Sequence, residues 1–203
     1  MKPLILFTVV VGALVGGSTE AASPFFYDRH LGVVARDSLW RAVSDGPRIA
    51  RSDVLKVYVR CYRDTSSFEQ VFERKFGESA TRVIAFYTGG ADLYLRNGTC
   101  AQVHVFLGGA HTVYTAGAYS ILLHEALHRQ GVRDERITTC LASDAVRWGA
   151  LWFGFDEQQS LRARNLAFTY TRLFAPRAYF MGKPTCLALT RRTEWIDHRQ
   201  RSG

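Results

Sequence analysis

Hydrophobic positions alternate with polar ones in the first half of the chain. Residues 54–61 show this alternation and are rich in β-branched and aromatic side chains, which predicts a strand. Two further strands are expected at 82–87 and 91–96, where an intervening Gly-Gly pair indicates a hairpin. A fourth strand is expected at 103–107, with His104 satisfied by a local partner. The first half therefore predicts a small β-sheet.

In the remaining segments the apolar residues recur at helical spacing, which predicts helices. Short helices are expected at 37–43 and at 66–76, the second capped by Ser66 or Ser67. Three long helices are expected at 116–130, 134–153 and 157–174, the last of them ended by Pro176. Strands followed by long helices define an α+β fold class. Since no repeat or low-complexity linker interrupts the pattern, residues 23–203 are expected to form one domain, with the Arg-rich tail 191–203 on its surface.

The first 22 residues have the composition of a secretory signal peptide. A positive start at Lys2 precedes an apolar stretch at 3–17 and small residues near a cleavage point at Ala22. The apolar stretch is shorter than the about 20 residues of a membrane span. We expect a secreted, extracellular domain without a stable membrane span. An uncleaved anchor is the alternative reading of the same segment.

Composition supports a soluble globular domain and excludes disordered, collagenous and coiled-coil classes, because 47% of the 203 residues are hydrophobic and 22% are charged. The formal net charge is +8, which favours polyanionic surroundings. The basic residues are scattered, however, and no basic stripe carries interleaved aromatic residues. We therefore expect a solvated basic surface and no nucleic-acid partner.

The four cysteines of the chain all follow the expected leader. An even number of cysteines in an oxidising compartment predicts two disulfides, for which three pairings exist. We favour Cys61 with Cys100 and Cys140 with Cys186. A thiolate metal site is not expected, because no Cys-x-x-Cys spacing occurs.

The chemistry of the chain is concentrated in the expected helix 116–130, which contains His124-Glu125-x-x-His128. Two histidines four residues apart project from one helix face and can reach the same tetrahedral cation. Glu125 lies beside that face, where a carboxylate can take a proton from a metal-bound water without occupying a coordination position. Chance would produce this spacing on the order of 0.01 times in a chain of this composition. Two histidines that only pack or face water are therefore the weaker explanation.

The motif resembles the active-site helix of the zincin metallopeptidases. This resemblance implies a zincin-like fold, with a small sheet beside the active-site helix, and one zinc ion bound by His124 and His128. It also implies that Glu125 acts as general base and acid. The implied function is that of a secreted, monomeric zinc peptidase that hydrolyses peptide bonds in a peptide or protein substrate. The alternative is a catalytically silent zincin-like protein that binds zinc or a cell-surface partner.

A catalytic zinc usually has three protein ligands, so a third ligand is needed. In the gluzincin-like interpretation, Gly131 ends the first helix, Asp134 caps the next one and Glu135 binds the metal. In the metzincin-like interpretation, Asp134 binds the metal, although Met181 stands in an unusual context for a methionine turn. We favour Glu135 over Asp134, with a distant acid such as Asp144 as a third alternative.

A group that stabilises a developing oxyanion is also expected outside the motif. Tyr170, Tyr179 and His111 are candidates that the sequence does not rank, and each is also a natural packing residue. The tripeptide Asn97-Gly98-Thr99 matches a glycosylation sequon and is interpreted as a turn.

Overall fold

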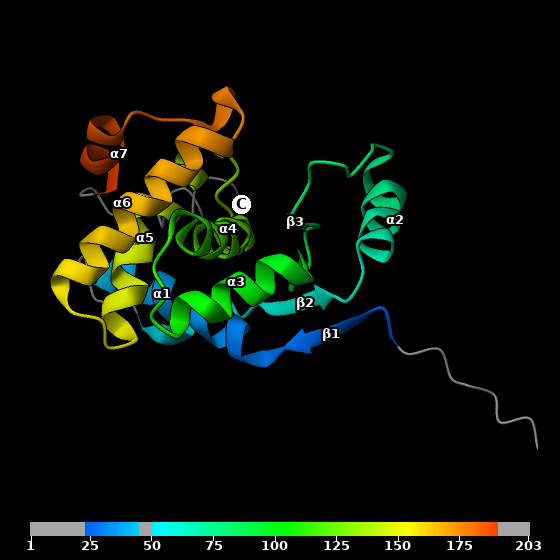
Figure 1. Cartoon of the computed structure of the whole chain (residues 1–203), viewed down its shortest axis with the longest axis horizontal. Helices are drawn as coiled ribbons and strands as arrows, with labels where there is room; N and C mark the ends of the chain where they lie inside the picture. The colour runs from blue at the N-terminus through cyan, green and yellow to red at the C-terminus, as the bar shows by residue number, and fades with distance from the viewer. Residues whose placement is uncertain (1–22, 45–49, 191–203) are drawn as a thin grey trace, which may run out of the picture.

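The described residues, 23–44 and 50–190 of this computed structural model, form a four-stranded sheet and a larger group of helices (Figure 1). Residues 1–22, where a leader is expected, and the Arg-rich tail at 191–203 lie outside the described residues. The elements along the chain are β1 Phe25–Asp28, α1 Arg29–Ser44, η1 Arg51–Asp53, β2 Tyr58–Tyr62, α2 Thr65–Phe76, β3 Ala85–Tyr87, β4 Asp92–Arg96, α3 Asn97–Leu107, α4 Val113–Arg129, α5 Glu135–Trp152, α6 Glu157–Phe174, η2 Arg177–Tyr179 and α7 Lys183–Thr190. The α+β class is therefore confirmed.

The sheet has the strand order β1-β2-β4-β3. Strands β3 and β4 form the expected antiparallel hairpin, with Phe86 opposite Tyr94. Strand β2 confirms the expectation for 54–61 in a shortened and shifted form, and it pairs in parallel with β4. Strand β1, which the sequence analysis missed, pairs antiparallel with β2.

Alternation along the strands divides the apolar side chains between two cores. Val59 and Leu93 are buried in the main core together with residues of α1, α3, α4 and α5. Tyr94 and Phe86 point to the opposite face, where they pack with Phe68 of α2 in an aromatic core. Helix α2 therefore covers one face of the sheet, and the larger helical group covers the other (Figure 1).

Helix α4 lies at the centre of the helical group and contacts α1, α3, α5 and α6 as well as β3 and β4. Two glycines permit the close approach of its neighbours. A Cβ atom at Gly117 would lie 2.2 Å from the ring of Tyr170 on α6, and one at Gly149 of α5 would lie 2.0 Å from the hydroxyl of Tyr119. Helix α4 is consequently held on several sides, which makes it a rigid support for side chains on its remaining face.

Three local expectations were wrong. Residues 103–107 belong to α3 and not to a strand, and the same helix begins at Asn97, where a turn was expected. His104 is accordingly a helical residue, and its partner is the distant Asp28 of β1, whose carboxylate lies 2.6 Å away. The helix expected at 37–43 is confirmed and is longer than expected: it is the C-terminal part of α1, which begins at Arg29 because Asp28 accepts a hydrogen bond from the amide of Leu31.

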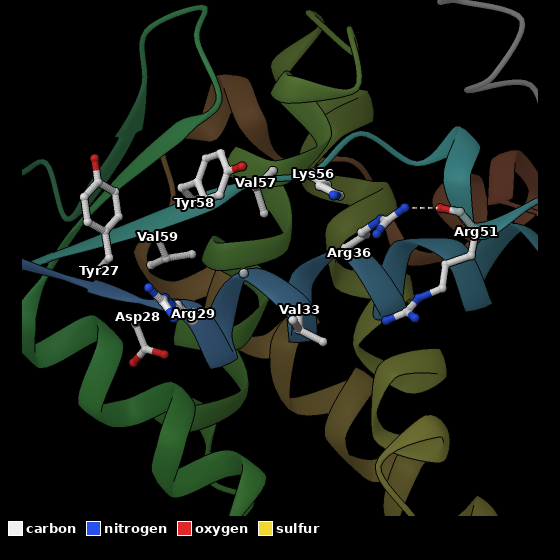
Figure 2. A pocket seen from close by; sticks show the side chains of 11 residues that line it. Tyr27, Asp28, Arg29, Val33, Arg36, Arg51, Lys56, Val57, Tyr58 and Val59 are labelled. Atoms are coloured by element: carbon white, nitrogen blue, oxygen red, sulfur yellow. Dashed lines mark hydrogen bonds between the residues drawn. The ribbon is translucent and has the colours of Figure 1, made fainter.

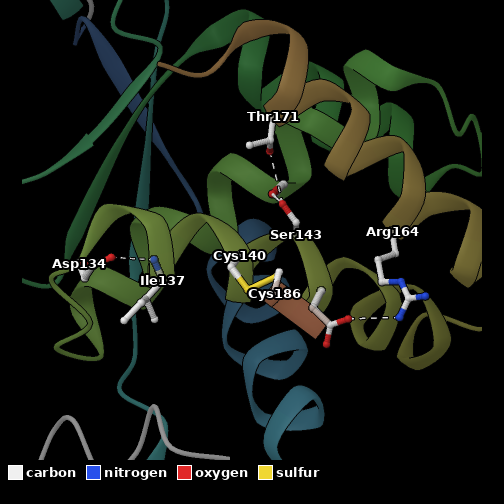
Figure 3. The surroundings of a disulfide bond; sticks show 9 residues. Asp134, Ile137, Cys140, Ser143, Arg164, Thr171 and Cys186 are labelled. Atoms are coloured by element: carbon white, nitrogen blue, oxygen red, sulfur yellow. Dashed lines mark hydrogen bonds and ion pairs between the residues drawn. A yellow bond between two sulfur atoms is a disulfide. The ribbon is translucent and has the colours of Figure 1, made fainter. Parts of the chain in front are cut away.

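The two disulfides have the favoured pairings. Cys61–Cys100 joins β2 to α3, and Cys140–Cys186 joins α5 to α7 (Figure 3). Such bonds persist in oxidising compartments, which is compatible with an extracellular location. Within the described residues, no helix combines the length and the apolar character that a membrane crossing requires.

Candidate metal centre

The site forms where α4 ends and α5 begins. Gly131 adopts a left-handed conformation with φ of +96°, which turns the chain after the last residues of α4. Asp134 then caps α5, because its carboxylate accepts a hydrogen bond from the amide of Ile137 (Figure 3). The turn is short, so Glu135 at the start of α5 returns to the face of α4 that carries His124 and His128.

Three potential metal-binding side chains converge at this point. Nε2 of His124 lies 2.9 Å from Nε2 of His128. The Glu135 carboxylate lies 3.0 Å from Nε2 of His124 and 3.4 Å from Nε2 of His128. The two imidazoles are largely buried, whereas the Glu135 side chain is 39% exposed. This trio is the group of possible metal ligands in the described part of the chain.

Both histidines are oriented through their other ring nitrogen. Nδ1 of His128 lies 2.7 Å from the carbonyl oxygen of Val132, and Nδ1 of His124 lies 3.2 Å from the hydroxyl of Thr139. A carbonyl only accepts, so Nδ1 of His128 carries the proton and Nε2 of the neutral ring presents a lone pair. The Thr139 hydroxyl can fix the same tautomer in His124. Partners of this kind orient histidine ligands in metal sites.

The lone pairs on Nε2 of the two histidines face one another beside the Glu135 carboxylate. Such an arrangement is repulsive unless a cation or a proton lies between the three groups. Glu135 Oε2 is buried and, despite its closeness to His124, accepts no hydrogen bond of good geometry from the described residues. Tetrahedral zinc bonds of about 2.1 Å place neighbouring donor atoms about 3.4 Å apart. The donor atoms here are within about half an ångström of that separation, so these residues fit a small divalent metal.

The pKa values of Glu135 and His128 reflect the same crowding. Burial alone would raise the pKa of Glu135, but the two imidazoles outweigh it and lower that pKa to about 2. Burial would lower the pKa of His128, yet the nearby Glu135 carboxylate and the Val132 carbonyl raise it overall. Both directions follow from the attraction between the Glu135 carboxylate and the imidazoles beside it.

Glu125 is buried beside the trio, with only 8% of its surface exposed. Burial raises the pKa of its carboxyl group, while the nearby His124 and His128 oppose that rise and Glu135 adds to it. A raised pKa is the direction that general acid–base catalysis by a carboxyl group requires.

The structure separates the three candidates for an oxyanion-stabilising group. The ring of Tyr179 in η2 lies parallel to that of His124, with 6.4 Å between the ring centroids. Burial raises the pKa of its hydroxyl, and the charges of Glu135 and Glu125 raise it further, so the group stays protonated. By contrast, Tyr170 packs over Gly117 and His111 packs between Phe106 and Phe155.

The alternative third ligands lie elsewhere. Asp134 is occupied as the cap of α5, and Asp144 pairs with Arg164 at 3.3 Å. Met181 packs against the core around the Cys140–Cys186 disulfide. Thr139 and the Val132 carbonyl were missed by the sequence analysis. Thr139 could have been found, because it stands four residues after Glu135 and therefore on the same helix face.

No protein-family model matches the chain, and no curated protein or solved structure matches it either. The relation to the zincins therefore stays a prediction that depends on the motif of α4.

Proposed function

We propose that this chain is a secreted zinc-dependent peptidase of zincin-like fold. The observation that carries the proposal is the convergence of His124, His128 and Glu135 beside the buried Glu125. In this proposal the trio holds one zinc ion per chain, and the substrate is a peptide or protein. A small sheet packed against the helix that bears the motif is consistent with this proposal.

Each side chain has a defined task in the proposed reaction. Bound zinc would polarise a carbonyl group and lower the pKa of water towards 7. Glu125 takes a proton from the attacking water and returns it to the departing amine. Its burial keeps bulk water away from the carboxylate, so the proton stays at the reacting centre.

Tyr179 has the proposed role of stabilising the transition state. Its hydroxyl remains protonated, and it can donate a hydrogen bond to an oxygen that gains negative charge. The parallel ring contact with His124 places Tyr179 next to the proposed metal ligands. Thr139 and the Val132 carbonyl are positioning groups, since they act on the two histidines and not on the substrate.

The test compares zinc content and peptide hydrolysis in one set of variants. The full chain is reconstituted with zinc, iron, manganese and cobalt in parallel, and bound metal is measured before hydrolysis of a quenched-fluorescent peptide library. We expect one zinc per wild-type chain and none in His128→Ala. Glu125→Gln should retain zinc and lose hydrolysis by about 10²–10⁴-fold. Glu73→Gln makes the same change on an exposed position of α2 and serves as the control.

Three results would contradict the proposal. A wild-type chain without bound zinc after reconstitution would remove the metal site. Zinc binding without hydrolysis of any library peptide would favour the catalytically silent zinc-binding protein. Hydrolysis that Glu125→Gln leaves intact would likewise remove Glu125 as the general base.

A further inference from the structure

A cavity of about 520 Å³ lies between α1 and the segment that leads into β2, and none of the metal-site residues lines it (Figure 2). This volume falls within the range of small-molecule sites. Its lining includes three apolar side chains, those of Val33, Val57 and Val59. A Cβ atom at Gly32 would lie 2.7 Å from the carbonyl oxygen of Val57, so α1 and the segment beneath it meet closely at the base of the cavity.

Three basic side chains of the lining have no acidic partner among the described residues: Arg29, Arg36 and Lys56. Arg36 is held in place, because its Nε donates to the carbonyl of Val54 at 3.0 Å and its Nη2 donates to that of Arg51 at 2.8 Å. Carbonyl partners fix a guanidinium without cancelling its charge. A fixed cation loses little freedom when an anion binds to it.

The remaining charged residues of the lining are already paired. Arg51 donates two hydrogen bonds to Asp37 at 2.6 and 2.7 Å. The carboxylate of Asp28 is used at both oxygens, one on the amide of Leu31 and the other on His104. The cavity therefore carries a net positive charge that the described residues do not neutralise.

Aromatic and aliphatic surface is exposed next to these cations. Tyr27 and Tyr58 are 49% and 52% exposed, and Val33 is 49% exposed. In Figure 2 the side chains of Lys56 and Arg36 lie at one end of the cavity and the two tyrosines lie at the other, with Val33 and Val57 between them. Such a lining suits an elongated ligand with an anionic head and an apolar body.

We propose that this cavity binds a small amphiphilic oxyanion, either an alkyl phosphate or an alkyl carboxylate. The oxyanion contacts Lys56 and Arg36, and the alkyl body lies on Val33, Val57 and the tyrosine rings. The site does not depend on the proposed peptidase activity, because its residues belong to α1, β1 and the chain around β2.

The test is calorimetric titration of the full chain with octyl phosphate and with octanoate, both as monomers. Inorganic phosphate and octanol represent the head and the body alone. We expect one ligand per chain, bound at least about tenfold more tightly than phosphate or octanol. The head group that binds more tightly identifies which oxyanion the site prefers.

Variants of the lining residues test whether octyl phosphate binds in this cavity. Lys56→Gln should weaken octyl phosphate binding about tenfold, and Arg29→Gln, which changes the tyrosine end of the cavity, should weaken it less (Figure 2). Val33→Asp should weaken it at least as much as Lys56→Gln, because it places a negative charge in the lining. Arg172→Gln removes one charge from an exposed position of α6 and should bind like wild type. His128→Ala should also bind like wild type, which separates this proposal from that of the metal centre.

Several results would overturn the proposal. They are equal affinities for octyl phosphate and octanol, equal affinities for octyl phosphate and inorganic phosphate, or unchanged binding in Lys56→Gln. Binding to anionic vesicles without binding to monomeric octyl phosphate would assign the basic surface to membranes instead. Circular dichroism establishes that each variant is folded.

Discussion

Thr139 Oγ1 lies 3.2 Å from Nδ1 of His124, so α5 orients a side chain that α4 carries. One turn earlier on α5, Glu135 approaches the other nitrogen of the same ring at 3.0 Å. A single helix face therefore contacts both nitrogens of His124. The position of that imidazole depends on the packing of α5 against α4 and not on α4 alone.

Replacement of Thr139 tests this positioning role. Thr139→Val keeps the shape of the side chain and removes the oxygen that contacts His124. We expect zinc affinity to fall about 10- to 100-fold, because outer partners of histidine ligands have effects of this size. Competition with a chromophoric chelator measures the affinity. Thr139→Ser retains the hydroxyl and should bind zinc like wild type, and an equal loss in both variants would assign Thr139 to packing only.

Replacing each of two adjacent acidic residues in turn tests which of them is the third metal ligand. Glu135→Gln should lower zinc affinity at least about 100-fold, since it removes the charged ligand from the trio. Asp134→Asn should leave zinc affinity unchanged, because asparagine also caps helices well. Metal content after dialysis against a weak chelator distinguishes them. The reverse pattern would support Asp134 and the metzincin-like interpretation.

Tyr179→Phe examines the proposed donor to the oxyanion. Zinc content and KM should stay near their wild-type values, while kcat should fall about 10²- to 10³-fold, as expected when one such donor is lost. Tyr170→Phe is the matched control, because that ring packs over Gly117, two turns before His124 on α4, whereas the ring of Tyr179 contacts that of His124. Steady-state kinetics of both variants on the same peptide provide the measurement. A rise in KM alone would make Tyr179 a substrate-binding residue.

The arrangement of the site could largely be predicted from sequence, because its residues are close along the chain. The spacing of His124 and His128 follows from the period of a helix, and the approach of Glu135 follows from a short turn with a cap at Asp134. The placement of Tyr179 could not be predicted. It depends on how η2 packs on α5, which is a contact between segments far apart in sequence.

The secondary structure could be predicted where a hydrophobic pattern extends over many residues. The prediction failed where the pattern is short, or where a glycine interrupts it. Residues 103–107 read as a strand because they are apolar and partly β-branched. The longer spacing of the buried Cys100, Val103 and Phe106 is helical, and it extends beyond that short window. In α1, Gly32 weakened the helical pattern, although the glycine is needed there by the close approach of Val57.

Gly149→Ala tests how closely α1, α4 and α5 pack. The added Cβ would lie 2.0 Å from the Tyr119 hydroxyl and 2.5 Å from Oγ of Ser38. Both hydroxyls are buried and hydrogen-bonded to each other, so they have little room to move. We expect a loss of about 1–3 kcal/mol in the free energy of unfolding, measured by urea denaturation. Gly98→Ala, with no atom near its added Cβ, should be neutral or stabilising by up to about 1 kcal/mol.

The two disulfides should have similar effects on stability and different effects on the metal centre. Their sequence separations are 39 and 46 residues, so loss of either should cost about 4 kcal/mol by chain entropy. Cys140 is adjacent to Thr139, and its partner lies in α7, a few residues after Tyr179. Double alanine replacement of Cys140 and Cys186 should therefore also weaken zinc binding.

Double alanine replacement of Cys61 and Cys100 provides the comparison. This bond joins β2 to α3, and neither residue borders the trio, so zinc affinity in the folded variant should equal that of wild type. Zinc affinity is measured well below the midpoint of thermal unfolding in each variant, so that the lost stability does not enter the comparison. Equal zinc affinities in the two double variants would show that α4 and the first turns of α5 hold the metal centre without help from the α5–α7 bond. A loss confined to the Cys140–Cys186 variant would show that the disulfide keeps Thr139 in place against His124.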